Sequence, residues 1–215
     1  MDKNDLQGRH FVITAGGTQE PIDLVRHIGN RSSGKMGYAL AEAARDRGAN
    51  VTLITAPATI PVPENMEVIR VRTVAQMREA VLKAVAGTDA LIMAAAVSDF
   101  RVVNPAGYKI KKGAGKLTLE LVENEDFLLE LPDDFIKVGF AAESEDLVKN
   151  AQKKLVEKRL DLIAANDITA DDSGFDVDTN KVTLIHRAGT LEDLPLMSKR
   201  EVADEILDRV VKLLV

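Results

Sequence analysis

The residue types best suited to chemistry lie in the segment from Phe11 to Gly37, which combines two adjacent glycines with a run of polar side chains. Gly16 and Gly17 follow a short apolar stretch that is typical of a buried strand. Loops from a strand to a helix usually contain roughly two to six residues, and this one is much longer. We therefore expect a binding loop at the carboxyl end of a strand, where glycine would allow a tight turn and close approach of a ligand.

The last part of this loop has the composition of an anion site. Small and polar residues stand directly before a helix expected to begin at Met36, namely Asn30, Ser32, Ser33, Gly34 and Lys35. Free backbone N–H groups and the helix dipole favour negative charge at such a position. A serine-capped helix with solvated charges explains the same residues equally well, so the sequence leaves both interpretations open.

Two further strand ends are candidates for the wall of a site. Met93-Ala94-Ala95 ends in small side chains that leave room for a planar base or a ribose, and Asp99 follows. An aspartate there could bind a metal or a ligand, although capping a turn is the simpler interpretation. Phe140 ends a later strand, where a phenylalanine more often packs in the core. Lys154 and Lys158 are four residues apart and share a helix face, which is ordinarily solvated.

Three lysines in the segment Tyr108-Lys109-Ile110-Lys111-Lys112 are flanked by glycines and a proline. A solvated charged loop is the usual interpretation. Tyr108 and Lys112 also match the Y-x-x-x-K pair of short-chain dehydrogenases, but the flanking glycines and proline argue against the helix that this pair requires. An NAD(P)-dependent oxidoreductase of Rossmann type is thus the alternative function. The incomplete G-x-G-x-x-G pattern and the neutral end of the second strand, Ile54–Pro57, count against it.

Strand-like and helix-like segments alternate along the chain and must position these residues. Strands are predicted at Phe11–Ala15, Val51–Thr55, Glu67–Val71, Ala90–Ala96, Leu117–Leu121, Ile136–Ala141 and Leu160–Ala164, and helices at Met36–Arg47, Val74–Ala86, Leu147–Lys158 and Lys199–Leu214. The alternation predicts a three-layer, Rossmann-like α/β fold with a mostly parallel sheet. A late antiparallel edge hairpin is predicted, with Asp178-Thr179-Asn180 between Gly174–Val177 and Lys181–His186. The length fits a single domain over residues 1–215.

Composition excludes several classes of function. The formal charge of −6 argues against nucleic-acid binding, which usually needs a basic face. The charged start MDKNDLQGRH and the lack of a long apolar run argue against a signal peptide and membrane contact, so we expect a cytoplasmic protein. The absence of cysteine excludes disulfides, thiolate catalysis and cysteine-ligated zinc. The scattered histidines suggest no metal site.

The loop TAGGTQEPIDLVRHIGNRSSGKMG resembles the signature loop of bacterial, CTP-using phosphopantothenate-cysteine ligases, also called phosphopantothenoylcysteine synthetases. The alanine-rich strand end before Asp99, the KIKK segment at Lys109, the GFAAE segment at Phe140 and the AND segment at Asn166 resemble the family in the same order. The resemblance covers almost the whole chain. It implies a similar α/β fold, a homodimer, and fusion to or association with a flavin-dependent phosphopantothenoylcysteine decarboxylase.

The resemblance also implies roles for individual residues. Asn30 would steady the activated acyl intermediate, Arg26 would hold the acidic substrate or that intermediate, and Lys109 would bind triphosphate and offset charge as pyrophosphate leaves. The predicted nucleotide site comprises Gly16, Gly17, Ser32, Ser33, Gly34, Lys35, Met93, Ala94, Ala95, Asp99, Lys109, Phe140, Lys154 and Lys158.

The implied reaction joins 4'-phosphopantothenate and L-cysteine, with CTP as co-substrate and Mg²⁺ bridging the triphosphate. The carboxylate attacks the α-phosphorus of CTP and releases pyrophosphate, and the cysteine amine then displaces CMP from the acyl cytidylate. Such chemistry needs positioning and electrostatic help more than a protein nucleophile. The metal ligands stay unassigned. A catalytically silent nucleotide-binding module is a further alternative that only an assay can test.

Overall fold

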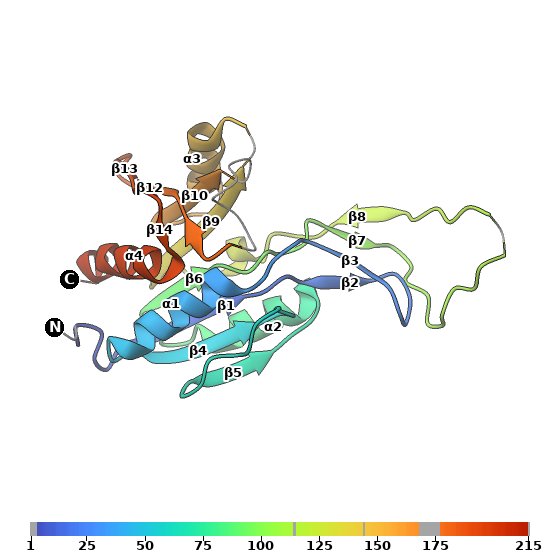
Figure 1. Ribbon diagram of the computed structural model, residues 1–215, viewed down its shortest axis with the longest axis horizontal. Helices are drawn as coiled ribbons and strands as arrows, with labels where there is room; N and C mark the ends of the chain where they lie inside the picture. The colour runs from blue at the N-terminus through green and yellow to red at the C-terminus, as the bar shows by residue number, and fades with distance from the viewer. Residues whose placement is uncertain (1–3, 114, 144, 168–176, 215) are drawn as a thin grey trace.

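The computed structural model describes residues 4–113, 115–143, 145–167 and 177–214, and its centre is an eight-stranded sheet in the order β13-β12-β10-β9-β6-β1-β4-β5 (Figure 1). Six strands pair in parallel, and two antiparallel strands complete one edge. The parallel strands are β1 (His10–Ala15), β4 (Asn50–Thr55), β5 (Glu67–Arg70), β6 (Ala90–Met93), β9 (Ile136–Glu143) and β10 (Leu162–Asp167), and the antiparallel ones are β12 (Val182–His186) and β13 (Leu191–Asp193). The predicted fold class is therefore confirmed.

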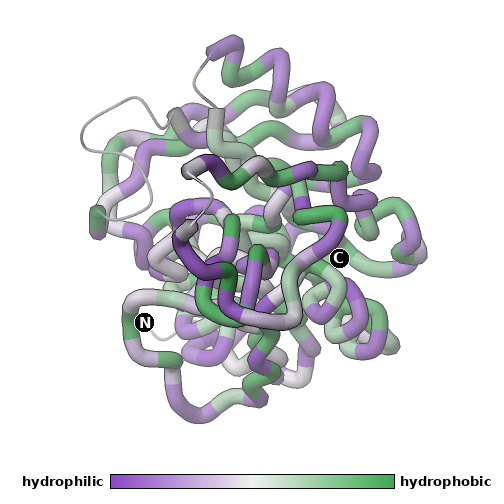
Figure 2. The backbone as a smooth tube through the Cα atoms, turned by 90° about the vertical axis from the view of Figure 1, so that its right-hand side faces the viewer, coloured by the Kyte–Doolittle hydropathy of each residue, from purple (hydrophilic) through white to green (hydrophobic). Residues whose placement is uncertain are grey.

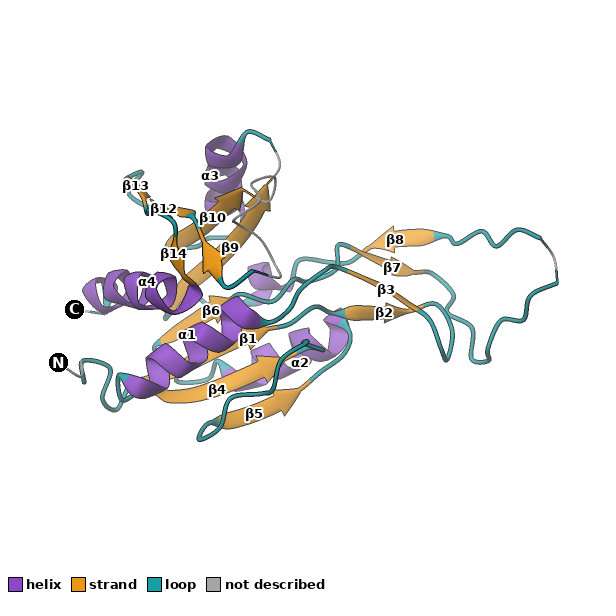
Figure 3. Ribbon diagram, in the orientation of Figure 1, coloured by secondary structure: helices purple, strands orange, loops and turns teal. Residues whose placement is uncertain are grey.

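Helices cover both faces of this sheet because successive strand residues point to opposite sides (Figure 3). On one face, β1 residues Phe11 and Ile13 pack with α1 (Lys35–Asp46) and α4 (Lys199–Leu213). On the other, Val12 packs with α2 (Val74–Ala84) and with the short 3-10 helix η1 (Phe127–Glu130), while α3 (Leu147–Glu157) covers β9, β10 and β12. The three layers follow from this alternation.

The order in which the chain adds strands to the sheet reverses between β1 and β6. From β1 the chain adds β4 and β5 on one side, then crosses over to add β6, β9 and β10 on the other. In open α/β sheets, ligands bind outside the carboxyl ends of the strands at such a switch point. An isolated bridge between Gly17 and Ala96 continues the β1–β6 pairing past both strand ends. The topology thus directs attention to the loops that follow β1 and β6.

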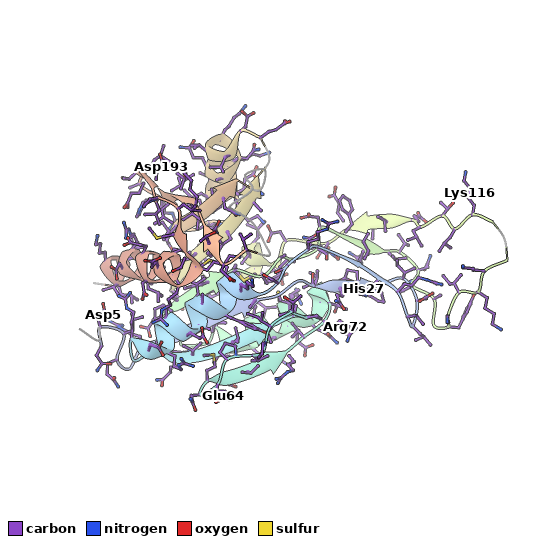
Figure 4. The ribbon with its side chains drawn as sticks, viewed as in Figure 1. Asp5, His27, Glu64, Arg72, Lys116 and Asp193 are labelled. Atoms are coloured by element: carbon purple, nitrogen blue, oxygen red, sulfur yellow. The ribbon has the colours of Figure 1, made fainter. Side chains whose placement is uncertain are left out.

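The loops after β1 and β6 also build an arm that projects from the sheet (Figure 1). The arm contains two antiparallel pairs, β2 (Gln19–Pro21) with β3 (His27–Gly29), and β7 (Phe100–Val102) with β8 (Leu121–Glu123). Lys116 lies at its far end, and Arg72 lies near its base (Figure 4), where the Arg72 carbonyl accepts a hydrogen bond from the Gln19 amide. The strand predicted at Leu117–Leu121 is wrong: β8 begins at Leu121 and belongs to the arm.

Two other predicted boundaries need correction. The edge hairpin exists, and β12 corresponds to the predicted strand Lys181–His186, but its hairpin partner is the later strand β13. Residues 174–176 of the predicted first strand lie outside the described residues. The predicted turn is wrong, because Thr179–Asn180 forms β11, which pairs with β14 (Met197–Ser198). β6 ends at Met93, earlier than Ala96, because Ala95 and the residues after it bend into the loop. Among the helices of the described residues, none combines the length and apolarity needed to cross a bilayer.

At Gly37, α1 packs closely against β1. A Cβ atom at Gly37 would lie 2.5 Å from the Ala15 Cβ and 2.9 Å from the Thr14 carbonyl oxygen. Alanine would favour the helix by about 1 kcal/mol, but overpacking against backbone costs about 1–3 kcal/mol and more for rigid neighbours. We expect Gly37→Ala to lower the free energy of unfolding by about 2 kcal/mol in urea denaturation. Gly107→Ala, with nothing within 4 Å of the added Cβ, is the control; equal stability of the two variants would contradict this packing.

Candidate functional site

A cavity opens at the switch point, between the loop that precedes α1, the loop after β6 and the ends of β9 and β10. Most of the predicted nucleotide-site residues line it, together with Asn30: Asn30, Ser32, Ser33, Gly34, Lys35, Met93, Ala94, Ala95, Asp99, Phe140, Lys154 and Lys158. Segments far apart in the sequence are thus brought together in one place. Their part in binding a nucleotide stays a prediction.

Asn30 is held against the alanine-rich segment. Its Nδ2 donates to the Val97 carbonyl oxygen at 3.0 Å. The backbone reinforces this contact, because the Ala96 amide donates to the Gly16 carbonyl at 2.8 Å and the Thr18 amide donates to the Ala96 carbonyl at 3.2 Å. A side-chain amide carries two N–H donors and a carbonyl acceptor, so Asn30 keeps polar atoms for a ligand after bonding Val97.

Gly16 and Gly17 allow close backbone packing next to the cavity but do not line it. Gly16 has a φ of +78°, and a Cβ there would overlap the carbonyl oxygen of Ala56. At Gly17, a Cβ would lie 2.8 Å from the Asn30 carbonyl oxygen. The tight turn expected at Gly16 is therefore present. Neither glycine is among the residues that line the cavity, and their contact with a nucleotide stays a prediction.

The N-terminus of α1 opens on the cavity through Gly34, Lys35 and Gly37. Gly34 is the N-cap residue, with a φ of +81°. The Ser32 hydroxyl accepts a hydrogen bond from the Gly34 amide at 3.3 Å, and the Ser33 hydroxyl accepts one from the Lys35 amide at 3.5 Å. The serine-capped interpretation is therefore supported in part, because serine hydroxyls contact amides at this helix start. The first turn also contains no acidic residue, so its dipole is available to an anion.

The described lining of the cavity is strongly cationic although the chain is acidic overall. It contains four lysines, Lys35, Lys154, Lys158 and Lys199, and one carboxylate, that of Asp99. Lys35 Nζ bonds Asp178 Oδ1 at 2.7 Å, and this hydrogen bond is the main cause of a pKa of Asp178 below its ordinary value. Lys158 Nζ pairs with Asp126 at 2.8 Å. An anionic ligand would be favoured here by charge as well as by the helix end.

Three buried polar residues of the cavity were not among the predicted site residues. Asn166, Asn180 and Lys199 all line it. Asn166 is the penultimate residue of β10, and a polar residue near the end of a parallel strand was a readable signal. Asn180 and Lys199 reach the cavity because β11 pairs with β14 directly before α4. Their sequence neighbourhood gave no hint of this pairing.

Arg26 and Lys109 lie together on the arm and do not line the cavity. The Arg26 guanidinium pairs with Asp23 at 2.5 Å and donates to the Ile110 carbonyl at 3.3 Å, and the Ile110 amide donates to Asp23 Oδ2 at 3.1 Å. Lys109, the neighbour of Ile110, is thereby tied to the same part of the arm as Arg26. The structure brings these two predicted catalytic residues near each other but not to the other site residues.

Asp23 is the anchor of this part of the arm. Burial raises the pKa of its carboxyl, but hydrogen bonds from the amides of Val25, Arg26 and Ile110, together with the Arg26 charge, hold the pKa below its ordinary value of 3.8. The anchor is therefore fully present above pH 3.8 and is lost as the pH falls through the lowered pKa. We expect Asp23→Asn, at neutral pH, to increase hydrogen exchange at the Ile110 amide at least tenfold. Asp193→Asn, at an exposed position, is the control. Unchanged exchange at the Ile110 amide in Asp23→Asn would show that Asp23 does not hold the arm.

Two features of a dehydrogenase site are absent from the described residues. Tyr108 and Lys112 lie in a loop without helical structure, as the flanking residues predicted, and β4 ends at the neutral residue Thr55, with neutral Ala56 and Pro57 after it. The described residues also contain no group of three or more histidines, aspartates and glutamates that could hold a metal ion.

Comparison with known proteins gives a consistent result. The model of the family described as the DNA/pantothenate metabolism flavoprotein C-terminal domain matches residues 6–214. The coenzyme A biosynthesis bifunctional protein CoaBC of Bacillus subtilis (strain 168) is 48% identical over 97% of this chain and 52% of its own length. A protein of an unknown prokaryotic organism, named cysteine/cysteine sulfinic acid decarboxylase, is 41% identical over 99% of this chain and 61% of its own length.

A solved structure agrees with these matches. The crystal structure of the C-terminal domain of a coenzyme A biosynthesis bifunctional protein CoaBC superimposes with a TM-score of 0.84, at 37% identity, and covers 99% of this chain and 98% of that chain. The chain spans about half the length of the CoaBC relative from Bacillus subtilis.

Proposed function

Because the chain belongs to the family of DNA/pantothenate metabolism flavoprotein C-terminal domains, we propose that it is a cytoplasmic phosphopantothenate-cysteine ligase of coenzyme A biosynthesis that uses CTP. The observation that carries the proposal is the cationic cavity at the switch point, where Asn30, the N-terminus of α1 and the alanine-rich loop after β6 meet. A ligand with phosphates and a flat base matches these three features in charge and shape.

The proposed reaction has two steps. The carboxylate of 4'-phosphopantothenate attacks the α-phosphorus of CTP, forming an acyl cytidylate and releasing pyrophosphate, and the amine of L-cysteine then attacks the acyl carbon and expels CMP. Asn30 steadies the acyl intermediate through its amide. Lys35 and the N-terminus of α1 bind phosphate oxygens and offset their negative charge. Ala94 and Ala95 leave room for the nucleoside beside Phe140. All nucleophiles come from the substrates, so the protein contributes orientation and electrostatic stabilisation.

A divalent ion fits this cavity only as a partner of the substrate. Among the described residues that line the cavity, Asp99 contributes the one carboxylate. Mg²⁺ is usually held by one or two carboxylates plus substrate phosphates, and Asp99 is the residue that would hold it here. When bound, the ion would neutralise charge on the pyrophosphate as it leaves.

We further propose a homodimer in which the arm of one copy completes the cavity of the other. The arm exposes a set of apolar side chains, Leu24, Val25, Phe100, Val103, Tyr108, Leu117, Leu121 and Val122. Figure 2 looks at the molecule from the arm's side and shows hydrophobic segments interleaved with hydrophilic ones along it. An exposed apolar set of this size favours an interface. A partner's arm would bring Arg26 and Lys109 to substrates bound in a cavity that they do not line within their own chain.

A flavin-dependent decarboxylase is the proposed functional partner. The relative from Bacillus subtilis is named as a bifunctional protein, and this chain matches about half of it. The ligase product, 4'-phosphopantothenoyl-L-cysteine, carries the carboxylate that a decarboxylase would remove. Fusion or association of the two activities would pass this product directly to the next step.

The test of the proposed function is product formation by the purified chain. 4'-Phosphopantothenate, L-cysteine and Mg²⁺ are incubated with CTP or with ATP, and products are identified by mass spectrometry. The proposal predicts 4'-phosphopantothenoyl-L-cysteine and CMP in equal amounts with CTP, and much less product with ATP. Efficient turnover with ATP would contradict the nucleotide assignment, and no conjugate with either nucleotide would contradict the ligase.

A further inference from the structure

Lys199 is a lysine buried at the edge of the cavity. It is 5% exposed, although lysine is among the residue types least often buried. Its backbone is fixed at the start of α4: its amide donates to the Asp178 carbonyl at 2.9 Å, and the preceding Ser198 forms a capping box with Glu201. Because the Lys199 side chain is buried and its backbone is held by these hydrogen bonds, we infer that its ammonium group has a defined position.

That position is beside the N-terminal turn of α1. Lys35 and Lys199 line the nucleotide-site cavity and also a second, neighbouring cavity between α1 and residues 60–63. Both lysines therefore stand at the boundary of the two cavities. Lys35 is the first residue of α1, so Lys199 adds a positive charge close to a helix N-terminus. The exposed carboxylate of Asp178 pairs with Lys35 at 2.7 Å, and the hydrogen bond from Lys35, together with the charges of Lys35 and Lys199, lowers its pKa.

We propose that Lys199 is a phosphate-binding residue of the cavity, acting with Lys35 and the N-terminus of α1. A phosphate there would accept charge-assisted hydrogen bonds from the two ammonium groups, in addition to the exposed carboxylate of Asp178 that already pairs with Lys35. Only the identity of the ligand rests on the proposed function, under which two substrates carry phosphate. These are the triphosphate of CTP and the single phosphate of 4'-phosphopantothenate.

The test compares three variants with the wild type by isothermal titration calorimetry. Lys199→Gln removes the charge and keeps much of the side chain, whereas Lys199→Arg keeps the charge. Lys181→Gln is the matched control, because Lys181 lies in the same part of the chain but is exposed and does not line the cavity. The probes are CTP, 4'-phosphopantothenate, cytidine and inorganic tripolyphosphate. Thermal denaturation of each variant reports whether the fold is intact.

The proposal predicts at least a tenfold rise in Kd for one phosphate-bearing substrate in Lys199→Gln, partial recovery in Lys199→Arg, and no change in Lys181→Gln. A rise confined to CTP assigns Lys199 to the triphosphate, and a rise confined to 4'-phosphopantothenate assigns it to that phosphate. Cytidine, which lacks phosphate, should bind all variants alike. Unchanged Kd values for every phosphate probe, or an equal loss for cytidine and CTP, would overturn the proposal.

Tripolyphosphate separates this inference from the proposed function. If the wild type binds tripolyphosphate and Lys199→Gln loses that binding, Lys199 is a phosphate-binding residue even where CTP and 4'-phosphopantothenate fail to bind. In that case the ligase assignment would be wrong and the site would serve another phosphorylated ligand. If CTP supports ligation while Lys199→Gln binds every probe like the wild type, the proposed function stands and the role of Lys199 is wrong.

Discussion

Asn30→Ala is expected to lower the rate of acyl-cytidylate formation roughly 100-fold, the loss that removal of one preorganised amide donor typically causes. The amide of Asn30 lines the cavity and is oriented by its 3.0 Å hydrogen bond to the Val97 carbonyl. Its remaining polar atoms can therefore stabilise charge without first being reoriented. Pyrophosphate release in single-turnover experiments gives the rate, and calorimetry gives the Kd for CTP.

The CTP affinity of Asn30→Ala should stay within about twofold of the wild type, because the proposed role lies in the transition state rather than in ground-state binding. Asn4→Ala, an exposed position remote in sequence from every lining residue, is the control and should leave both quantities unchanged. A rate close to that of the wild type would contradict the catalytic role. A loss explained entirely by a higher Kd for CTP would make Asn30 a binding residue instead.

Mixed dimers should reveal a second large effect. Asn30→Ala and Lys109→Ala homodimers are each expected to be nearly inactive. If the arm completes the partner's cavity, a heterodimer of the two variants contains one intact site, because the chain with native Asn30 receives native Lys109 from its partner. Its activity should be about half that of the wild type. Co-expression with two different tags and tandem affinity purification isolates this heterodimer for the assay.

The opposite outcome is equally informative. If each arm serves its own chain, both sites of the heterodimer carry one defect, and its activity stays as low as that of the parent homodimers. The exposed apolar residues of the arm provide the control on assembly. Val25→Asp should shift the protein from dimer to monomer in analytical ultracentrifugation, since Val25 is 60% exposed in the single chain and its substitution should leave the core intact.

The main sheet and helices could be predicted because they follow strong periodic patterns. Buried parallel strands such as β1 are continuous apolar runs, and α1 shows apolar residues at three- and four-residue spacing. Three of the four predicted helix starts coincide with the observed ones, and the remaining bounds differ by one or two residues. Local capping boxes at Thr73 and Ser198 reinforce two of the starts. Each of these features is encoded within a few neighbouring residues.

The arm could not be predicted in the same way. Its strands are three residues long, which is too short for a periodic signal, and each pairs with another short strand of the arm. The long polar loop after β1 was correctly identified as unusual. That it contains a hairpin anchored by Asp23 and Glu20 was not visible, since Glu20 bonds the Val74 amide at the start of α2, across a long separation in sequence.

Several residues that line the cavity could be predicted because they lie in the loops after a strand or before a helix. Asp99 lies in the loop after β6 and Asn30 in the loop before α1, and both line the cavity. Lys199 was missed because its place depends on the pairing of β11 with β14, which involves only two residues in each strand. Arg26 and Lys109 were named from family motifs, and motifs do not state which copy of a chain a residue serves.

The most direct test of the central claim follows oxygen from the carboxylate. 4'-Phosphopantothenate labelled with ¹⁸O in its carboxylate is incubated with the purified chain, CTP, L-cysteine and Mg²⁺, and the products are analysed by mass spectrometry. If the carboxylate attacks the α-phosphorus of CTP, one labelled oxygen appears in CMP, and pyrophosphate is unlabelled. Label in inorganic phosphate or pyrophosphate, or CMP without label beside a formed amide, would contradict the acyl cytidylate.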